Sequence, residues 1–525
     1  MRKPILAALS AWLSLAACTT AAPGPPPAAT VVPTPSRPPA SATPAPTQAS
    51  PTFAAGACPF DVPASLKITC GFLEVREEHS AEVSRLIRLA VAIVHSSGAE
   101  PAPDPVIFLN GGPGVPTVAY TLETAAAWKP FLGERDLILF DQRGVGLSQP
   151  ALQCSEVPPV ELELIQQDLP PAEFDARILE AREACLRRLT ADGVVLGAYN
   201  LTESAADVRD LRLALGLEQV NLFGLSYGTF LAQSVLAHYR AEGWIRSVIL
   251  DSARPLWLVA DAAAGTAGAQ SAFEYLFRRC AEDAACHARY PDLEALYLKT
   301  AAQLAETPLT ATVTHPVSGQ RLKVVVNNRV FTSLIFSALY SRQAFPRLPR
   351  LIERTQAGFT DELEARGGPL QNYLFSLDYA NAGLSLSLAC SGRESPSTPP
   401  AEVYPDLHSQ LENWRAYQQQ LCADWDQTPI DLAQQGPFPS AVPALILAGE
   451  FDPVTPPGPA QLLADQWENA AYRLFPGTGH GVLTSGGKVT TCSQAITAQF
   501  LTAPGQTLDS ACLADIQRPD FLIGY

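Results

Sequence analysis

The chain has 525 residues, of which 47% are hydrophobic and 17% are charged, and its formal net charge is −16 at pH 7. This length is enough for a large hydrophobic core and an additional domain. The acidic balance and the lack of a basic cluster argue against a nucleic-acid partner, because such proteins follow phosphates with clustered Lys and Arg side chains.

The N-terminus has the organisation of an export signal rather than of a folded element. Basic residues at positions 2 and 3 are followed by an apolar run over residues 5–15 and by Leu-Ala-Ala immediately before Cys18. The apolar run is too short to cross a bilayer, and no other segment of the sequence is long and apolar enough. The sequence therefore predicts a signal peptide over residues 1–17.

The residues before Cys18 resemble the lipobox of bacterial lipoproteins. This resemblance implies cleavage before Cys18 and lipidation of its thiol and new amino group; an ordinary secretory signal with a chance cysteine is the alternative. Residues 18–52 are dominated by Pro, Ala, Thr and Ser, which predicts an extended, solvated tether. The lipid chains would be the only membrane attachment, which places the chain in a bacterial cell envelope, facing the periplasm or the exterior.

The chain has 11 cysteines, and an even number remains when Cys18 is set aside. Local spacing suggests pairs, although the sequence leaves the connectivity open. The suggested pairs are Cys58 with Cys70, Cys154 with Cys185, Cys280 with Cys286, Cys390 with Cys422, and Cys492 with Cys512. Disulfides fit an oxidising compartment. A metal site is the alternative, but His287 beside Cys286 lacks matching ligands, so neither a metal nor an organic cofactor is expected.

Segments rich in Val, Ile and Leu alternate with helical patterns, which predicts an α/β fold with a mostly parallel sheet and crossover helices. The first two strands are expected to form an antiparallel pair. The expected strands are residues 71–75, 86–94, 105–109, 136–140, 220–223, 246–250, 444–448 and 472–475.

Between residues 255 and 435 the strand pattern mostly stops and helical patterns dominate. We therefore predict one core built from residues 53–254 and 436–525, with a mostly helical cap inserted at 255–435. A second independent domain is the alternative. The insertion is favoured because the strands that resume after the cap supply what the first half lacks.

The sequence Gly224-Leu225-Ser226-Tyr227-Gly228 follows an apolar run and opens into a helical pattern. Strand, sharp turn and helix are the context of a nucleophile elbow. Only small residues fit beside such a turn, and the Ser226 hydroxyl would be exposed. The Tyr227 N–H and the helix N-terminus would then point at the charge that develops on a substrate oxygen.

A glycine-rich loop, Asn110-Gly111-Gly112-Pro113-Gly114, follows the expected strand 105–109. Glycines at this place let backbone N–H groups approach a substrate oxygen closely. Alone, such a loop is more often a simple turn. Its position after a strand and before the Gly-x-Ser-x-Gly motif favours an oxyanion-binding loop.

A serine nucleophile needs a base and an acid that orients the base, and in folds with this elbow the chain order is Ser, Asp or Glu, and His. Among the seven histidines, His480 alone follows the resumed strands. It lies in a Gly-rich loop that would let the imidazole move over a cleft. His79, His95 and His238 lie in or beside expected elements and are assigned to the surface or to packing.

Asp452 is the candidate acid because it follows the expected strand 444–448 at the carboxyl edge of the sheet, where sites in α/β folds form. Glu450 is its local competitor, with a solvated loop carboxylate as the simpler interpretation. Asp452 is preferred because Pro453 would fix the backbone just after it.

Five segments together resemble the ordered signature of the proline iminopeptidase and tripeptidyl aminopeptidase family of α/β-hydrolases. The string Asp-Gln-Arg-Gly-Val-Gly-Leu-Ser at 141–148 is the most specific of them. The resemblance covers about residues 55–520, and the late region is similar to the tripeptidyl aminopeptidase branch. The segments are 110–114, 141–148, 224–228, 449–456 and 477–480, with 388–390 and 422–425 marking the late region.

The resemblance implies that Ser226 is the nucleophile, His480 the base and Asp452 its partner. It also implies that the backbone N–H groups of Gly112 and Tyr227 bind the oxyanion. Acidic cap residues in the family bind the free amino group of the substrate, often through a pair just after the cysteine that matches Cys390. Here Ser391, Gly392 and Arg393 come first, and Glu394 is the candidate substrate-binding residue.

Three functions are compatible with this pattern. The first is a secreted, lipid-anchored serine exopeptidase that releases residues or short peptides from a free amino end through an acyl-enzyme. The second is a carboxylesterase, because the same triad cleaves esters and amides. A binding protein on an inactive hydrolase fold is disfavoured because every catalytic position is filled. Peptides or small esters are therefore the expected substrates.

Overall fold

The computed structural model describes most of the chain after the predicted tether. The described residues are 50–98, 100–122, 128, 131–258, 262–379, 382–391, 404, 420–423, 425 and 436–524. The predicted signal peptide, Cys18, nearly all of the tether and Glu394 lie outside them. The first strand begins at Thr52, the last residue of the predicted tether.

A nine-stranded sheet lies at the centre of the described part of the chain, in the order β1-β2-β3-β5-β4-β6-β7-β10-β11. The pairs from β1 to β5 in this order are antiparallel, and the pairs from β5 to β11 are parallel. The mostly parallel sheet and the opening antiparallel pair are therefore confirmed. The strands are β1 (Thr52–Gly56), β2 (Ile68–Arg76), β3 (Leu86–Val94), β4 (Val106–Leu109), β5 (Leu137–Phe140), β6 (Val220–Leu225), β7 (Ile245–Asp251), β10 (Ala444–Gly449) and β11 (Ala470–Phe475).

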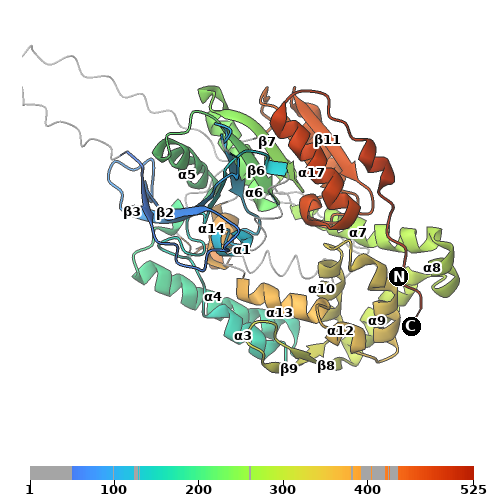
Figure 1. Ribbon diagram of the computed structural model, residues 1–525. Helices are drawn as coiled ribbons and strands as arrows, with labels where there is room; N and C mark the ends of the chain where they lie inside the picture. The colour runs from blue at the N-terminus through green and yellow to red at the C-terminus, as the bar shows by residue number, and fades with distance from the viewer. Residues whose placement is uncertain are drawn as a thin grey trace, which may run out of the picture. The chain divides into compact units, whose positions relative to one another are not determined.

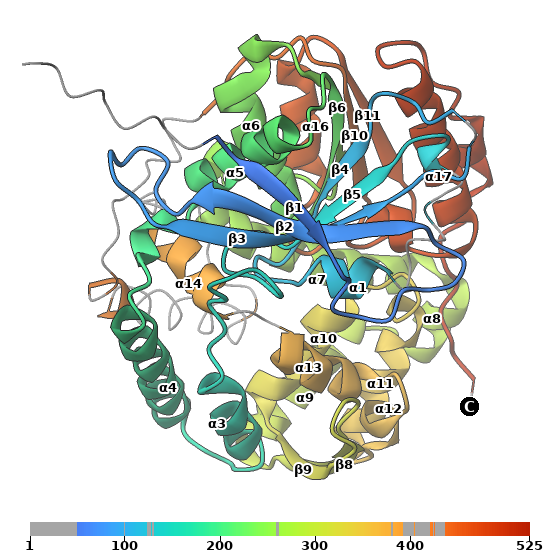
Figure 2. The same cartoon turned by 60° about the vertical axis from the view of Figure 1, so that its left-hand side comes forward.

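The central strands are apolar throughout because helices cover both faces of the sheet. Ile107 and Leu109 pack on one face with α5 (Leu201–Ala214), α6 (Tyr227–Tyr239) and α16 (Pro457–Gln466). Phe108 points to the other face, which α17 (Gly487–Thr502) covers. Figure 2 shows α5, α6 and α16 on one side of the strands and α17 on the other.

Between β7 and β10, the described residues 262–379 and 382–391 are mostly helical, and they are called the helical region below. It has its own hydrophobic cluster, in which the rings of Phe273, Tyr297 and Phe331 are buried. An antiparallel hairpin of β8 (Leu309–Thr314) and β9 (Arg321–Val326) was not expected. The helices are α7 (Ala262–Glu282), α8 (Ala284–Arg289), α9 (Leu293–Glu306), α10 (Asn328–Ala338), α11 (Leu348–Gln356), α12 (Asp361–Glu364), α13 (Pro369–Tyr379) and α14 (Ala382–Ser391) (Figure 1).

The helical region also packs against α3 (Val157–Leu164) and α4 (Pro171–Ala191), which the sequence analysis placed in the first part of the core. The N–H of Val325 on β9 donates to the Ile165 oxygen at 2.8 Å. The Tyr373 hydroxyl on α13 donates to Glu161 at 3.3 Å. Both views place α3 beside α13 and the β8–β9 hairpin.

Five disulfides link cysteines in the described part of the chain, and they are the pairs that local spacing suggested. They join Cys58 to Cys70, Cys154 to Cys185, Cys280 to Cys286, Cys390 to Cys422, and Cys492 to Cys512. Because disulfides persist in oxidising compartments, they indicate an extracellular or cell-envelope location. Among the described helices, none is both long and apolar enough to cross a membrane.

Candidate active site

Ser226 lies at the sharp turn between β6 and α6, with backbone angles φ 54° and ψ −120°. A positive φ is strained for a residue other than glycine, and such strain concentrates at functional sites. The Ser226 N–H donates to the Asp251 oxygen at 3.0 Å, and the Thr229 N–H donates to the Ser226 oxygen at 2.8 Å. These bonds hold the turn in its strained form.

The flanking glycines are required by close backbone packing. A Cβ on Gly224 would lie 2.5 Å from the Gly228 oxygen. A Cβ on Gly228 would overlap the carbonyl of Leu109 at the end of β4. A side chain at either position would therefore push the turn away from the sheet.

The glycine-rich loop after β4 lies beside the serine. A Cβ on Gly111 would be 3.1 Å from the Ser226 Cβ and 3.7 Å from its Oγ. Gly112 has φ 112°, which favours glycine. The Gly111 N–H is already used, because it donates to the Asn110 side chain at 2.8 Å. Tyr227 is the first residue of α6, so its backbone N–H has no hydrogen-bond partner within the helix.

The structure brings His480 and Asp452 together. The Nδ1 atom of His480 is 2.8 Å from Oδ2 of Asp452. The buried carboxylate also accepts the N–H groups of Val454 and Thr455 at 2.9 Å each and the Thr455 hydroxyl at 2.7 Å. Because one carboxylate oxygen is held by the backbone, the other keeps a fixed direction toward the imidazole.

The two groups change each other's pKa. Burial lowers the pKa of His480, but the negative charges of Asp452 and Asp251 outweigh burial and raise it above its usual value. Burial raises the pKa of Asp452, but the neighbouring His480 and the bonds from Thr455 hold it below its usual value. Asp452 is therefore an ionised partner that stabilises a protonated imidazole.

Glu450, the competing acid, has other partners. It accepts the Gly477 N–H at 2.7 Å and the Tyr275 hydroxyl at 2.8 Å, and it forms an ion pair with Arg518. It is thus a half-buried anchor of the loop before His480 rather than a solvated carboxylate.

The loop that carries His480 is tied to the core on its far side as well. The Gly481 N–H donates to the Ser252 hydroxyl at 2.8 Å, and the N–H groups of Val482 and Leu483 donate to the Asp251 carboxylate at 2.8 and 2.9 Å. The expectation that this Gly-rich loop lets the imidazole move is therefore wrong for the backbone. Close packing requires the glycines instead: a Cβ on Gly479 would lie 2.5 Å from the Tyr340 oxygen.

Residues 141–148 fix backbone rather than provide reacting groups. The buried Asp141 carboxylate accepts the N–H groups of Thr117, Val118 and Leu147 at 2.6, 2.8 and 2.8 Å. It therefore joins this string to the segment that follows the glycine-rich loop.

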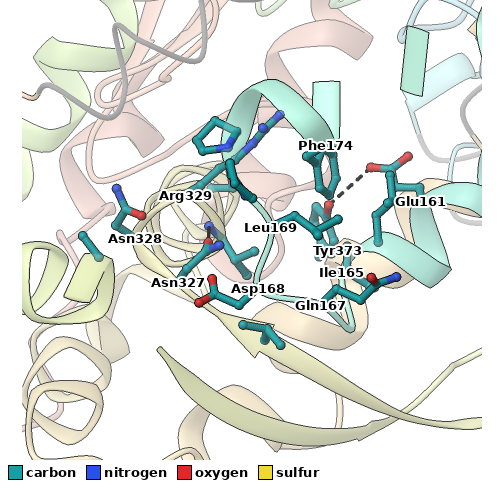
Figure 3. Close-up of a pocket in the computed structure, with 17 residues that line it drawn as sticks. Glu161, Ile165, Gln167, Asp168, Leu169, Phe174, Asn327, Asn328, Arg329 and Tyr373 are labelled. Carbon is teal, nitrogen blue, oxygen red and sulfur yellow. Dashed lines mark hydrogen bonds between the residues drawn. The ribbon is translucent and has the colours of Figure 1, made fainter. Parts of the chain in front are cut away.

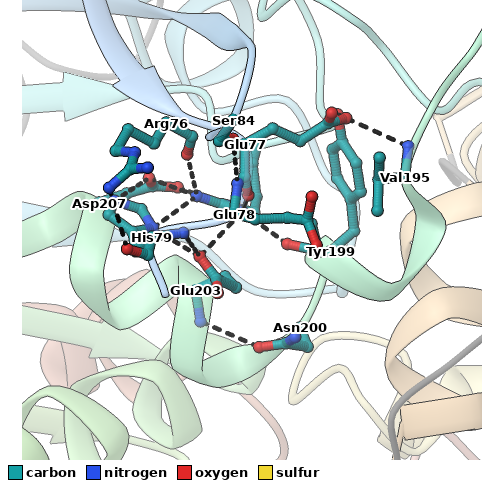
Figure 4. A network of polar contacts seen from close by, with 12 residues as sticks. Arg76, Glu77, Glu78, His79, Ser84, Val195, Tyr199, Asn200, Glu203 and Asp207 are labelled. Carbon is teal, nitrogen blue, oxygen red and sulfur yellow. Dashed lines mark hydrogen bonds and ion pairs between the residues drawn. The ribbon is translucent and has the colours of Figure 1, made fainter. Parts of the chain in front are cut away.

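Arg143, which has a fully buried side chain, forms two hydrogen bonds of 2.7 Å with Asp207. Beside this pair, His79 contacts Glu203 at 2.5 Å (Figure 4). It also contacts Asp210 at 3.1 Å. Burial lowers the pKa of His79, but these carboxylates and Asp207 together raise it to about 9. His79 is thus a structural cation.

A cavity of about 490 Å³ lies between the α3–α4 segment, β9, α10 and α13, and its lining includes Glu161, Arg329 and Tyr373 (Figure 3). The predicted triad and oxyanion residues do not line it. It is therefore separate from the candidate active site.

Among the residues that hold the His480 loop, sequence reasoning missed Asp251, Ser252, Tyr340 and Arg342. Asp251 ends a buried strand at the carboxyl edge of the sheet, a position that could have marked it. The other three lie in no motif that the sequence analysis used.

Comparisons with known proteins show which families and relatives this chain is similar to. Residues 104–306 match the family model of the alpha/beta hydrolase fold, and residues 408–512 match that of the TAP-like proteins. The chain is 25% identical over 475 residues to "Putative hydrolase YuaR" of Escherichia coli (strain K12), covering 86% of this chain and 89% of that protein. It is 24% identical over 424 residues to the tripeptidyl aminopeptidase of Streptomyces lividans, covering 76% of this chain and 75% of that protein.

A solved structure of the proline iminopeptidase of Mycobacterium smegmatis is also similar, with a TM-score of 0.32 and 14% identity over 79% of this chain and 95% of that chain. The sheet topology and the match over residues 104–306 show that this chain has the alpha/beta hydrolase fold, and its residues 408–512 are similar to TAP-like proteins.

Proposed function

We propose that the chain is a serine hydrolase with Ser226 as nucleophile, His480 as general base and Asp452 as the acid that orients the base. The observation that carries this proposal is the 2.8 Å contact between His480 and Asp452. These residues follow β11 and β10, and Ser226 follows β6, which is separated from β10 by β7; all three lie at the carboxyl edge of parallel strands of one sheet.

In the proposed reaction, His480 takes the hydroxyl proton of Ser226 while the serine oxygen attacks the substrate carbonyl carbon. The backbone N–H groups of Gly112 and Tyr227 would bind the negative oxygen of the tetrahedral intermediate. His480 then gives the proton to the leaving group, which departs and leaves an acyl-enzyme. Water hydrolyses the acyl-enzyme with His480 again acting as the base.

The proposed substrates are peptides with a free amino end, which would make the enzyme an aminopeptidase of the proline iminopeptidase or tripeptidyl aminopeptidase type. The match to TAP-like proteins and the similarity to a tripeptidyl aminopeptidase support this choice. We also propose that residues 255–435 form a cap on the core. The cap would admit only the free ends of peptide chains to the active site. Glu394 would bind the substrate amino group.

A carboxylesterase is the second candidate. It is favoured by one observation: Ser391, Gly392 and Arg393 stand between Cys390 and the first acidic residue, Glu394. Without an acidic group at the expected place, binding of a free amino group weakens, whereas the triad would still cleave esters.

The cellular setting is also part of the proposal. We propose export by the signal peptide at residues 1–17, lipidation of Cys18, and anchoring through the tether at 18–52. The five disulfides support export, because they require an oxidising compartment.

Hydrolysis of matched chromogenic substrates tests the choice between peptidase and esterase. The set contains free-amino mono-, di- and tripeptidyl anilides, their N-blocked versions and short acyl esters. The aminopeptidase proposal expects Ser226-dependent cleavage of the free anilides, with the blocked anilides cleaved far more slowly. Cleavage of the esters alone would support the carboxylesterase.

A further inference from the structure

The turn that follows α10 packs directly on the loop that carries His480. We call residues 339–343 the α10 turn and residues 476–485 the histidine loop. The His480 N–H donates to the Tyr340 oxygen at 3.0 Å. The Gly479 backbone lies so close that a Cβ there would be 2.5 Å from the same oxygen. The two backbones therefore fit together without room for a side chain.

Side chains of the α10 turn add further bonds to the histidine loop. The Arg342 guanidinium donates to the oxygens of Pro476 and Gly477 at 3.1 and 2.5 Å. The Gln343 amide donates to the Ser485 oxygen. The turn thus holds the loop before, at and after His480, from the side of the helical region.

The Tyr340 ring also contacts the imidazole itself. The ring centroids of Tyr340 and His480 are 5.1 Å apart at an interplanar angle of 66°, an edge-to-face arrangement. Phe336, one turn earlier on α10, packs edge-to-face on Tyr340 at 5.6 Å. Because Phe336 supports one side of the Tyr340 ring, that ring is a defined wall for His480.

A second contact on the imidazole has a chemical consequence. Asp452 holds His480 through one ring atom, Nδ1, so the ring can still tilt about that hydrogen bond. A base must keep its other nitrogen aimed at the nucleophile, because small misplacements of reacting groups lower rates strongly. An aromatic wall beside the ring restricts that tilt.

We infer that the helical region contributes directly to catalysis, with Tyr340 as a positioning residue for His480 and Arg342 as an anchor of the histidine loop. This inference rests on the proposed triad. It assigns the helical region a role besides control of substrate access, because the catalytic base is held by the core and by the insertion together.

The test compares variants of the full chain, purified in detergent, on the best substrate found for the wild type. Tyr340→Ala and Tyr340→Leu remove the aromatic wall, and Tyr340→Phe keeps it. Tyr340 is 36% exposed, so these changes leave no cavity in the hydrophobic core. For the anchor, Arg342→Ala is matched by Arg350→Ala, because Arg350 instead bonds the Gly524 oxygen and Glu362.

We expect Tyr340→Ala and Tyr340→Leu to lower kcat by about 10- to 100-fold, with KM within about threefold of the wild type. The rate of Ser226 labelling by a fluorophosphonate should fall in parallel. Tyr340→Phe should keep kcat within about threefold of the wild type, since it retains the ring. Arg342→Ala should lower kcat more than Arg350→Ala does.

Three results would overturn the inference: an unchanged kcat in both ring-removing variants, a lower melting temperature with kcat kept, or a Tyr340→Phe variant as slow as Tyr340→Ala. Failure of the proposed triad would give a different experimental result. In that case Ser226→Ala would hydrolyse the substrate as fast as the wild type.

Discussion

The backbone oxygen of Asp251 accepts the Ser226 N–H at 3.0 Å. The carboxylate of the same residue accepts the N–H groups of Val482 and Leu483, just after His480. One buried residue at the end of β7 therefore holds both the elbow of the proposed nucleophile and the loop of the proposed base. The relative placement of these two groups depends on it.

Replacing this carboxylate tests that dependence. In Asp251→Asn the amide nitrogen cannot accept a hydrogen bond, so one buried N–H of the histidine loop loses its acceptor. We expect the free energy of unfolding to fall by about 1–3 kcal/mol, and kcat to fall with it. Urea unfolding and steady-state kinetics measure both. As a control, Asp361→Asn removes a half-exposed ion pair with Arg354 and should change stability by less than about 1 kcal/mol.

Ser252 gives a second test, because its backbone has φ 60° while its hydroxyl accepts the Gly481 N–H. Ser252→Ala loses the acceptor and keeps the strain, whereas Ser252→Gly loses the acceptor and relieves the strain. We expect the alanine variant to be less stable than the glycine variant by about 1 kcal/mol. Thermal unfolding of the two variants side by side measures the difference, and equal stability would contradict the expected strain.

The assignment of the acid predicts unequal effects at two neighbouring carboxylates. Asp452→Asn offers an N–H to His480 and favours the wrong tautomer, so kcat should fall by about 10⁴-fold. Glu450→Gln leaves the pair of Asp452 and His480 intact and weakens the contacts of residue 450 with Gly477, Tyr275 and Arg518, so kcat should fall by less than about tenfold. Purified variants assayed on one substrate give the ratio. A larger loss in the Glu450 variant would reverse the assignment.

The ion-pair network around His79 predicts that stability depends on pH. The network raises the pKa of His79 from 6.5 to about 9 in the folded chain. The network therefore contributes on the order of 3 kcal/mol to the free energy of unfolding. This contribution is fully present below about pH 6.5 and is lost as the pH rises through about 9. The groups that face His79 are Glu203, Asp207, Asp210 and Arg143.

The free energy of unfolding measured by urea at several pH values between about 6 and 10 checks this slope. His79→Gln removes the titrating group and should flatten the curve over this interval. A wild-type curve as flat as that of the variant would mean that His79 is not charged in the folded chain.

Sequence patterns located Ser226, Asp452 and His480 because each follows a strand that could be recognised. The carboxyl ends of parallel strands meet at one edge of a sheet, so residues that directly follow such strands lie at the same edge. The family resemblance added the order of the motifs. The preference for Asp452 over Glu450 as the partner of His480 agrees with the contacts, although the reason for it, a following proline, does not describe the bonds that hold the carboxylate.

Other parts of the site could not be predicted. Tyr340 and His480 are 140 positions apart, and their contact depends on how α10 ends against the histidine loop. No periodic pattern encodes such a contact. The strand β1, Thr-Phe-Ala-Ala-Gly, ends in three small residues that are depleted in strands, and it forms by pairing with β2. The packing of α3 on the helical region likewise arises from tertiary contacts.

Covalent labelling of Ser226 tests the central claim most directly. A fluorophosphonate reacts with a serine that a neighbouring base activates, and mass spectrometry of the digested chain locates the adduct. The account predicts one adduct on the peptide that contains Ser226, no adduct in Ser226→Ala, and greatly slowed labelling in His480→Ala. Absence of the adduct from Ser226 in a folded wild-type chain, or hydrolysis that persists in Ser226→Ala, would contradict it.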